Sequence, residues 1–419
     1  MSFVLRQPRD YLAARQAIYQ PLRQFFPWEW EKDKKHDQEY ALASIYHVDP
    51  AFVQELRAAA QSMYSVIART VKVLQKASDG TLADLGLPLS LLPFLRAMPW
   101  DSRRIFGRFD FADTAQGVKM LEFNADTPYL ILEAYLGNAA ACSYFGLQDP
   151  NAGCLEDIST FFQQSMELAQ RDSCLTKTVF FTSVDFEEDR RTAECLRSLS
   201  GLSSRGRFVL LKDLRICADG LYAVTENSLE KVDVLYRMHP LENFALDKAA
   251  DGYPTGLECL RLVVEKKLVL INPIPALLAQ TKALQALIWG LYTEKAFFTA
   301  PERESIARYM LPTCLENCFA GKSRYVEKAI FGREGGAVAI FEPDGTLLAK
   351  DKLPYYWKQP KVDQKYVDVK SLRVTGVQGA FDGKLIWGVF VAGGKPSAVT
   401  IRLSGNITDA DAKFLPVGI

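Results

Sequence analysis

The order of predicted elements changes along the chain, and this change is what most constrains the fold. From residue 176 to residue 292, short apolar runs that read as strands alternate with stretches of helical periodicity. Such alternation is typical of a parallel sheet with helices packed on it. From about residue 325 onward, strand follows strand, with hairpin turns predicted at Asp344-Gly345 and Asp382-Gly383. We therefore expect an α+β / α/β fold in which an α/β region precedes an antiparallel, β-rich C-terminal region.

The first third of the chain is predicted to contain two helices with a hairpin between them. Asp49-Pro50 is an N-cap sequence, and apolar residues at helical spacing follow it over residues 50–74. Apolar and polar residues then alternate over 105–111 and 118–123, as in the two strands of a hairpin. The second helix is expected over 129–145, with Gly146 as its C-terminal stop.

The length of the chain, 419 residues, predicts two or three domains at roughly 100–200 residues each. We place an N-terminal helical region with the hairpin at 1–150, an α/β domain at 151–275, and a third region at 276–419. This third region is predicted to open with a helix over 277–292 and to continue into the C-terminal strands.

Charge and cysteine content exclude several classes of protein. Lys and Arg number 50 and so do Asp and Glu, so no basic excess exists to neutralise a nucleic-acid backbone. The N-terminus lacks the apolar core of a secretory signal, and no apolar run reaches the ~20 residues that a membrane span needs. Cys314 and Cys318 could share a helix face, but two ligands are too few for structural zinc. We expect a cytoplasmic protein with reduced thiols and with neither nucleic acid nor membrane as partner.

Four polar residues of the predicted hairpin are expected on one face. Arg108 and Asp110 are two apart on the first strand, and Glu122 and Asn124 are two apart on the second. If the turn centres near Gln116, Asp110 lies opposite Glu122 and Arg108 opposite Asn124, at cross-strand distances of ~5 Å. Two carboxylates and an amide oxygen suit Mg²⁺, and the arginine suits a phosphate or a carboxylate. The alternative is a solvated strand face with cross-strand ion pairs.

A glycine-rich turn joins two predicted strands within residues 325–338. Its glycines allow close backbone approach, and consecutive N–H groups in such a turn can bind an anion. Lys328 lies on the strand that leads in, and Arg333 lies in the turn. No helix and no Gly-Lys-Ser/Thr follows, so the turn is not a Walker A loop. It resembles a flexible hairpin lid over nucleotide phosphates, and the alternative is an ordinary β-hairpin. The glycines are Gly332, Gly335 and Gly336.

Further charged residues are candidates, each with a structural alternative. Arg402 lies in an apolar strand and needs a partner, either a structural carboxylate or a charged substrate. Glu242 follows a strand of the α/β region, where such folds bind ligands, and is otherwise a surface glutamate. Glu188 and Asp189 open a predicted helix, where they suit the helix dipole as capping charges.

Several segments, considered together, are typical of one family. They occur in order along most of the chain: GRFDF, LEFNADTP, VDVLYRMHPLE, LINPIPALLAQTKALQALIW, YVEKAIFGREGG, LPYYWKQPKVDQKYV and TIRLSGNIT. With them the chain resembles the glutathionylspermidine synthase family, which are carboxylate–amine ligases of the ATP-grasp type. The resemblance implies an ATP-grasp-like fold with a pre-ATP-grasp α/β domain at 151–275. It also implies a nucleotide-binding region with a glycine-rich lid at 276–419.

The resemblance implies a reaction in which ATP phosphorylates a substrate carboxylate and an amine then displaces phosphate to form an amide. ATP and Mg²⁺ would be the cofactors, and a small peptide-like carboxylate and an amine the partners. Carried over onto this sequence, Mg²⁺ would be held by Asp110, Glu122 and Asn124. ATP would be bound by Lys282, Lys328, Gly332, Arg333, Glu334, Gly335, Gly336 and Lys350. The substrate would be bound by Asp126, Thr127 and Glu242, and the catalytic residues would be Arg108 at the phosphoryl group and Arg402 at the tetrahedral oxyanion.

The sequence departs from the family pattern mainly on the substrate side. His239-Pro240-Leu241-Glu242 stands where Tyr-Pro-Trp-Glu is usual, and Tyr129-Leu130 where small hydroxylated residues are usual. Ala329 replaces a proline at the lid, and Leu403 replaces a common acidic residue. The resemblance therefore predicts the reaction class better than the substrates, and it predicts no oligomeric state. The alternative function is a nucleotide-binding regulatory or partner protein of ATP-grasp fold without ligase activity.

Overall fold

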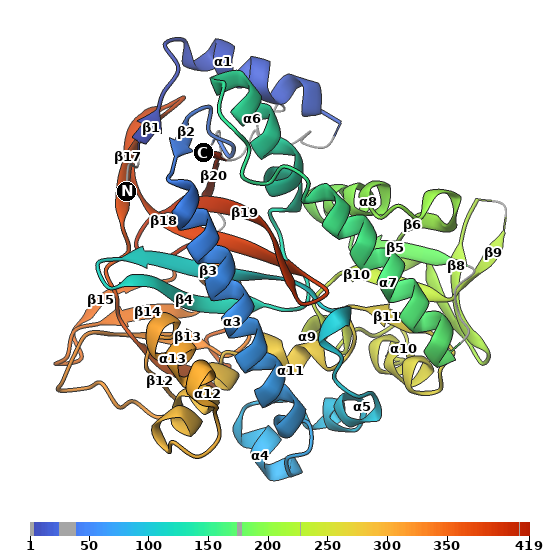
Figure 1. Ribbon diagram of the computed structural model, residues 1–419. Coiled ribbons are helices and arrows are strands. Elements are labelled where there is room, and N and C mark those ends of the chain that lie inside the picture. The colour runs from blue at the N-terminus through green and yellow to red at the C-terminus, as the bar shows by residue number, and fades with distance from the viewer. Residues whose placement is uncertain (1–3, 25–38, 174–177, 227, 410) are drawn as a thin grey trace.

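The computed structural model describes residues 4–24, 39–173, 178–226, 228–409 and 411–419. These residues form a mixed α/β protein in which helices surround several β-sheets (Figure 1). The long helix α3, Pro50–Leu74, crosses the molecule in front of the central strands. Asp49 accepts a hydrogen bond from the Ala51 N–H and so caps its first turn, which confirms the helix predicted from this sequence.

The predicted α/β region contains a parallel four-stranded sheet, on the right in Figure 1. Its order is β11-β10-β5-β6, and each neighbouring pair is parallel, as the alternation predicts. The strands are β5 Val179–Ser183, β6 Gly206–Leu210, β10 Val234–Met238 and β11 Val269–Ile271. The helices of this region are α7 Leu155–Ser173, α8 Glu187–Leu199 and α10 Thr255–Val264. A separate antiparallel sheet contains β7 Leu214–Cys217, β8 Gly220–Val224 and β9 Leu229–Val232.

The hairpin of the first third belongs to a six-stranded antiparallel sheet that also contains C-terminal strands. The order is β20-β19-β18-β3-β4, with β17 paired to β18. The strands are β3 Phe106–Thr114, β4 Gly117–Asn124, β17 Ser371–Gly376, β18 Gly379–Ala392, β19 Lys395–Ser404 and β20 Lys413–Leu415. The register places Asp110 of β3 opposite Gly388 of β18, so strands from the first third and from the last part of the chain build one sheet.

A second antiparallel sheet has five strands in the order β12-β16-β13-β14-β15. The strands are β12 Thr313–Cys314, β13 Tyr325–Ala329, β14 Val338–Phe341, β15 Leu347–Lys350 and β16 Lys361–Lys365. The turn predicted at Asp344-Gly345 joins β14 to β15 and is confirmed by a φ of 87° at Gly345.

The turn predicted at Asp382-Gly383 is wrong, because both residues lie inside β18. Asp382 pairs with Arg373 of β17 across the ladder, at 3.0 Å between oxygen and nitrogen. The chain reverses earlier, between Gly376 and Gly379, and the φ of 110° at Gly379 suits that turn.

The helix predicted over 277–292 is two helices, α11 Ala276–Gln280 and α12 Ala283–Thr293. Thr281 between them is extended, with ψ 133°, and the Lys282 N–H donates to the Ile330 carbonyl at 2.9 Å. Helical periodicity missed the break because the apolar pattern continues through it. Lys282 follows the break directly, and its Nζ lies 3.0 Å from Glu122 Oε2.

The helix predicted over 129–145 begins later than expected. Leu130 has φ 73°, outside the helical region, and a π-helical segment, Glu133–Gly137, leads into α6, Asn138–Phe145. Gly146 ends α6 with φ 62°, as the sequence predicts.

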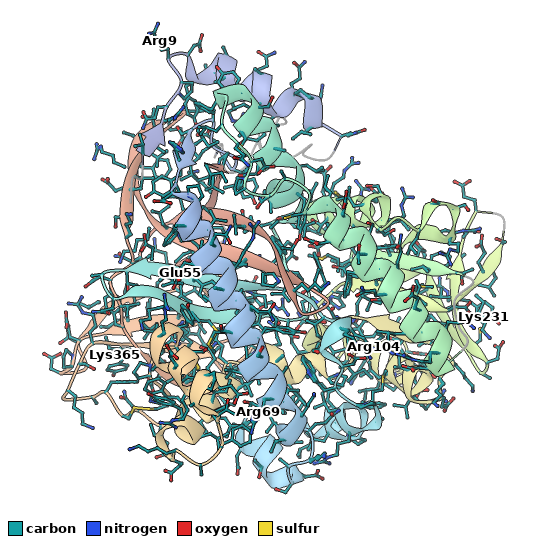
Figure 2. All side chains as sticks on the ribbon, in the orientation of Figure 1. Arg9, Glu55, Arg69, Arg104, Lys231 and Lys365 are labelled. Carbon is teal, nitrogen blue, oxygen red and sulfur yellow. A yellow bond between two sulfur atoms is a disulfide. The ribbon has the colours of Figure 1, made fainter. Side chains whose placement is uncertain are left out.

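The helix α13, Ala300–Tyr309, packs beside α3 and begins with a capping box formed by Thr299 and Glu302. Arg308 donates to Glu55 of α3 at 2.7 Å, and Arg69 of α3 lies 3.7 Å from Glu302. Glu55 and Arg69 mark this side of α3 in Figure 2. The opposite side of α3 is apolar and buried, which anchors the helix to the central sheet.

The remaining elements are short. A small sheet of β1 Val4–Arg6, β2 Ile45–His47 and β21 Val417–Gly418 brings both ends of the described chain together. The other helices are α1 Tyr11–Tyr19, α4 Asp79–Asp84, α5 Leu92–Ala97 and α9 Leu241–Phe244. Single 3₁₀ turns occur at Gln20–Leu22, Leu89–Leu91, Ser102–Arg104, Ser203–Arg205 and Leu211–Asp213.

Cys314 and Cys318 form a disulfide, which corrects the expectation of reduced thiols for this pair. Cys314 lies on β12 and Cys318 in the loop that follows, so the two do not share a helix face. The free thiols among the described residues are Cys142, Cys154, Cys195, Cys217 and Cys259. Within the described ranges, every helix is too short or too polar to cross a membrane.

Candidate active site

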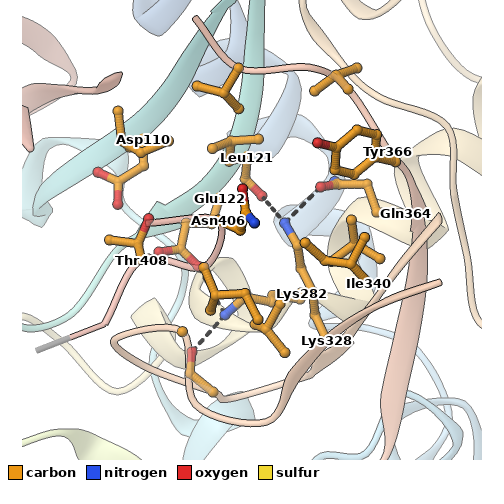
Figure 3. Close-up of a pocket in the computed structure, with 18 of the residues that line it drawn as sticks. Asp110, Leu121, Glu122, Lys282, Lys328, Ile340, Gln364, Tyr366, Asn406 and Thr408 are labelled. Carbon is orange, nitrogen blue, oxygen red and sulfur yellow. Dashed lines mark hydrogen bonds and ion pairs between the residues drawn. The ribbon is translucent and has the colours of Figure 1, made fainter. Parts of the chain in front are cut away.

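A cleft lies between the six-stranded and the five-stranded sheet (Figure 3). The hairpin β3–β4 and β19 form one wall, and β13, β16 and the loop 330–337 form the other. Lys282 enters from the break between α11 and α12. The lining includes Asp110, Glu122, Lys282, Lys328, Glu334 and Arg402, so both signs of charge meet in one cavity.

The hairpin register predicted from the sequence is confirmed. Arg108 lies opposite Asn124 and Asp110 opposite Glu122, and the register shifts only after Asp110. The turn is at residues 115–116, as expected from Gln116-Gly117. All four polar side chains therefore share one face of the sheet, and hydrogen bonds join Asn124 to Asp110 and to Glu122.

Asp110 is held by two arginines from different parts of the sequence. Arg108 donates to it through Nε at 2.6 Å and Nη2 at 3.0 Å, and Arg402 donates through Nη2 at 2.5 Å. Arg108 also donates to the Tyr129 carbonyl at 2.5 Å. Arg108 and Asp110 are buried. Burial acts to lower the pKa of Arg108, but the negative charge of Asp110 outweighs this effect and the pKa is raised. The arginine therefore stays charged beside the cleft.

Gly388 makes room for the Arg108 side chain. It lies on β18 between Asp110 of β3 and Thr400 of β19. A Cβ at this position would lie 2.9 Å from Arg108 Cδ and 2.6 Å from Thr400 Cγ2. Only glycine leaves the Arg108 side chain space to lie flat across β18.

Glu122 and two lysines form the second charged group of the cleft. Lys282 Nζ lies 3.0 Å from Glu122 Oε2, and Lys328 Nζ donates to Gln364 Oε1 at 2.7 Å. Burial acts to raise the pKa of Glu122, but the charges of Lys282, Lys328 and Arg402 hold it well below its usual value. Burial lowers the pKa of Lys328 to about 8, with Lys282 adding to the effect and Glu122 opposing it. Glu122 is therefore ionised, and Lys328 titrates near neutral pH.

The glycine loop covers the cleft and is packed tightly. Lys282 Nζ donates to the Gly332 carbonyl at 2.7 Å (Figure 3). Gly335 has φ 69°, and a Cβ there would lie 2.0 Å from the Thr408 carbonyl oxygen. A Cβ on Gly336 would lie 2.5 Å from the Tyr356 ring. The strand–turn–strand arrangement is confirmed, and close contacts on both sides of the loop account for its glycines.

Seven of the predicted residues are not among those that line the cleft: Arg108, Asn124, Asp126, Thr127, Glu242, Arg333 and Lys350. Arg333 turns away from it and binds Glu242 and Thr127. Asp126, expected to bind substrate, is fully buried, and Arg237 donates to both of its oxygens at 2.9 and 2.7 Å. Lys350, expected to bind ATP, is exposed on the edge strand β15 and does not line the cleft.

A group of carboxylates that the sequence did not predict as a unit lies next to this site. Glu133, Glu188, Asp189 and Glu334 come from the π-helical segment, α8 and the glycine loop. Burial, with the charges of Glu133, Glu334 and Asp189, raises the pKa of Glu188 to about 8. Hydroxyl groups are the hydrogen-bond partners: Tyr40 donates to Glu133 and Tyr129 to Asp189, both at 2.6 Å.

The capping role expected of Glu188 and Asp189 is only part of what they do. Both lie in the first turn of α8, where they suit the helix dipole, but Asp189 accepts its bond from Tyr129 and no side chain caps α8. Glu133 Oε2 is buried and has no hydrogen-bond partner among the described residues. One signal in the sequence could have suggested this group, a lone acidic residue inside the apolar run from Leu130 to Tyr135.

Gln364 is a site residue that was not predicted from the sequence. It lines the cleft, accepts the bond from Lys328, and donates to Gln285 and Thr313 through Nε2. It thus fixes the Lys328 ammonium from the side opposite Glu122. Gln364 belongs to the segment QPKVDQKYV, which resembles the family but carries no charge pattern that would mark this glutamine.

The three residues expected to hold Mg²⁺ suit such an ion in type, because carboxylate and amide oxygens are its preferred ligands. Asn124 donates through Nδ2 to Asp110 Oδ2 at 3.3 Å and to Glu122 Oε1 at 3.5 Å. The amide would have to present Oδ1 in place of Nδ2 to bind the ion. Asp110 shares both of its oxygens with arginines. Among the described residues, no group of three or more His, Cys, Asp or Glu could hold a metal by itself.

A cleft in which lysines and arginines meet two carboxylates beneath a glycine loop is a site for an anionic, metal-associated ligand. Comparison with known families agrees with the resemblance seen in the sequence. The sequence model of the glutathionylspermidine synthase pre-ATP-grasp family matches residues 13–419, and the chain belongs to this family.

Individual relatives are distant. The chain is 23% identical over 363 residues to the bifunctional glutathionylspermidine synthetase/amidase of Escherichia coli, covering 80% of this chain and 55% of that protein. It thus spans about half the length of that relative. It is 24% identical over 330 residues to a putative acid–amine ligase of Haemophilus influenzae, covering 74% of each chain. It is 28% identical to the glutathionylspermidine synthase of Crithidia fasciculata over 160 residues, 36% of this chain and 22% of that one.

A solved structure shares the fold. A glutathione synthetase-like effector from Globodera pallida, in its apo form, superposes with a TM-score of 0.56 at 11% identity. The superposition covers 98% of each chain. At this identity, the likeness extends to the fold alone.

Proposed function

We propose that the protein is an ATP- and Mg²⁺-dependent carboxylate–amine ligase of ATP-grasp type, similar to glutathionylspermidine synthase. The observation that carries the proposal is the convergence of Lys282, Lys328 and Arg402 on Asp110 and Glu122 beneath the glycine loop. These groups come from four separate parts of the sequence. Family membership and the ligase names of the E. coli and H. influenzae relatives support the same reaction class.

ATP would lie in the cleft with its phosphates toward the two lysines. Lys282 and Lys328 supply positive charge, and Gly332, Gly335 and Gly336 let the loop backbone approach a ligand closely. Apolar side chains of β13, β14 and the segment after β16 line the same cavity and suit the base. Lys350 is left out of this proposal because it is exposed outside the cleft.

Mg²⁺ would be held by Glu122 and Asn124, with Asp110 as the third ligand. When bound, the ion neutralises charge on the phosphates and orients them. When phosphates and water complete its coordination shell, Mg²⁺ needs only a few protein ligands. Two carboxylates and one amide are such a set.

The reaction would proceed in two steps. An oxygen of the substrate carboxylate attacks the γ-phosphorus, the bond to the β-phosphate oxygen breaks, and ADP leaves behind an acyl phosphate. The amine nitrogen then attacks the acyl carbon, the carbon–oxygen bond to phosphate breaks, and an amide and inorganic phosphate form. Arg108 would stabilise charge on the transferring phosphoryl group, and Arg402 the oxyanion of the tetrahedral intermediate. Their shared hold on Asp110 keeps both guanidinium groups in place before substrate arrives.

The carboxylate group of Glu133, Glu188, Asp189 and Glu334 would attract the amine, which is a cation at neutral pH. A cationic amine must lose a proton before it can attack. Glu188, whose pKa is raised to about 8, matches the proton affinity that such an acceptor needs. The partners would then be a small peptide-like carboxylate and an amine. The buried Asp126 would support this side of the site structurally without contacting substrate.

An ADP-release screen over peptides and amines tests the proposal, with products identified by mass. Lys328→Ala is expected to abolish substrate-dependent ADP release, and Lys350→Ala, on the exposed edge strand, is the matched control. Equal loss in both variants would contradict the assigned site. Nucleotide binding without ADP release for any substrate pair would favour the regulatory or partner protein instead.

A further inference from the structure

The glycine loop is attached to the protein by a side chain that leaves the cleft. Arg333 donates through Nε to Glu242 Oε1 at 2.9 Å and through Nη1 to Thr127 Oγ1 at 3.0 Å. Its Nη2 lies 2.9 Å from the same Glu242 oxygen. Glu242 is on α9, directly after the parallel strand β10, and Thr127 is in the loop after β4. The glycine loop is therefore tied to two segments, one that follows a strand of the six-stranded sheet and one that follows a strand of the parallel sheet.

A buried ion pair holds the two receiving residues side by side. Arg237 at the end of β10 pairs with both oxygens of Asp126, and neither side chain is exposed. Asp126 also accepts from the Leu241 N–H at 2.8 Å. Thr127 follows Asp126 and Glu242 follows Leu241, so this one carboxylate fixes the backbone of both partners of Arg333. Such a preformed acceptor favours one position of the loop.

The attachment is buried enough to be strong. Glu242 is 8% exposed, and the Arg333 side chain is 12% exposed. Removing one member of a buried pair leaves the other charge without compensation, which costs far more than loss of a surface pair. Burial acts to lower the pKa of Arg333, but the charges of Glu242 and Asp126 raise it, so the guanidinium stays charged.

The position of Arg333 decides where the next residues of the loop point. Glu334 and Gly335 follow it with φ 50° and 69°, and the Gly336 N–H donates to the Arg333 carbonyl at 2.7 Å. Because the turn is compact, the backbone positions of Glu334, Gly335 and Gly336 are largely determined once Arg333 is fixed. Glu334, Gly335 and Gly336 all line the cleft.

We propose that Arg333 and Glu242 are positioning residues whose ion pair holds the glycine loop over the cleft and so sets nucleotide affinity from outside the nucleotide site. Glu242 then acts on the lid, in place of the substrate contact expected from the sequence. The identity of the ligand as ATP rests on the proposed function, whereas the attachment of the loop does not.

The test measures the loop and the nucleotide separately. Hydrogen–deuterium exchange of a peptide covering residues 330–337 is compared between wild type and Glu242→Gln without any ligand. We expect about tenfold or faster exchange in the variant, because the loop loses its buried anchor. Calorimetric titration with Mg²⁺ and a non-hydrolysable ATP analogue should then give a Kd about tenfold or more above wild type.

Two further variants exclude a general loss of structure. Glu258→Gln removes a partly exposed carboxylate of α10 that pairs with Arg261, and it should leave both measurements unchanged. Arg333→Lys keeps the positive charge but lacks the guanidinium group that binds Glu242 and Thr127 together. Its exchange rate and its Kd should therefore lie between those of wild type and Glu242→Gln. If Glu242→Gln does not fold, the same two measurements on Arg333→Lys test the proposal.

Unchanged exchange in folded Glu242→Gln would overturn the proposal, and so would faster exchange with unchanged nucleotide affinity. If wild type binds no ATP analogue, the proposed function fails. The exchange data then still decide whether the ion pair anchors the loop.

Discussion

Arg402 of β19 reaches across β18 and donates to Asp110 of β3 at 2.5 Å. Strand β18 lies between them, and its Gly388 offers no side chain that would block the path. The hairpin of the first third and the last long strands of the chain thus share one charged site. The predictions below follow from this arrangement and from the groups around it.

Gly388→Ala is predicted to disturb the arginine pair directly. The added methyl would overlap Arg108 Cδ and Thr400 Cγ2, so one of them must shift. We expect the free energy of unfolding to fall by about 1–3 kcal/mol, as for other overpacked interiors. Urea denaturation measures this. Gly290→Ala is the control, because a Cβ in that exposed turn of α12 meets no atom within 4 Å and alanine favours helix. Equal stability of the two variants would contradict the packing described.

Asp126→Asn is predicted to destabilise the protein strongly. Arg237 would remain buried with half of its bidentate partner replaced by an amide, at a cost of about 3–5 kcal/mol. Chemical denaturation followed by circular dichroism gives the value. Asp382→Asn removes the same charge from an exposed pair with Arg373 and should leave stability nearly unchanged. A small effect in the first variant would mean that the Asp126 pair does not support the site.

Nucleotide binding is predicted to weaken as pH rises through about 8, the pKa to which burial lowers Lys328. Below this pH the lysine is charged and attracts phosphate, and above it the charge is lost. A bound polyphosphate should raise the pKa again, so binding near pH 8 takes up a proton. Calorimetry in buffers of different ionisation enthalpy detects that proton. Lys328→Arg keeps its charge throughout and should remove the dependence. The assignment is wrong if wild type and variant show the same pH profile.

Glu188→Gln is predicted to impair the amine side of the reaction and to spare nucleotide binding. Above pH 8, where Glu188 is ionised, the substitution removes one anion from the group formed with Glu133, Asp189 and Glu334. At such a pH we expect the KM for the amine to rise about tenfold or more, as for loss of an interaction with a charged group. The neighbouring Glu187→Gln is the control, because Glu187 is exposed at the start of α8. Steady-state kinetics with both variants would show equal KM values if the carboxylate group has no such role.

Features set by neighbouring residues were predictable from the sequence. The hairpin register followed from alternation and a two-residue turn, which together place Arg108 opposite Asn124 and Asp110 opposite Glu122. The start of α3 followed from Asp49-Pro50, and the end of α6 from Gly146. Each of these signals acts within a few residues of the structure that it determines.

Features set by distant contacts were not predictable in the same way. The break before Lys282 depends on a hydrogen bond to Ile330, and the apolar pattern continues through it. Asp126 was expected to bind substrate, and its partner Arg237 is too remote in sequence to indicate the buried ion pair. Arg333 could bind phosphate by its type, and only the tertiary fold places Glu242 within its reach.

The proposed chemistry is tested most directly by following one oxygen atom. Once a substrate pair is found, its carboxylate is prepared with a heavy oxygen isotope, and the released inorganic phosphate is analysed by mass spectrometry. An acyl-phosphate route predicts that one labelled oxygen moves from the carboxylate to phosphate for each amide formed. Amide formation with unlabelled phosphate would contradict the account.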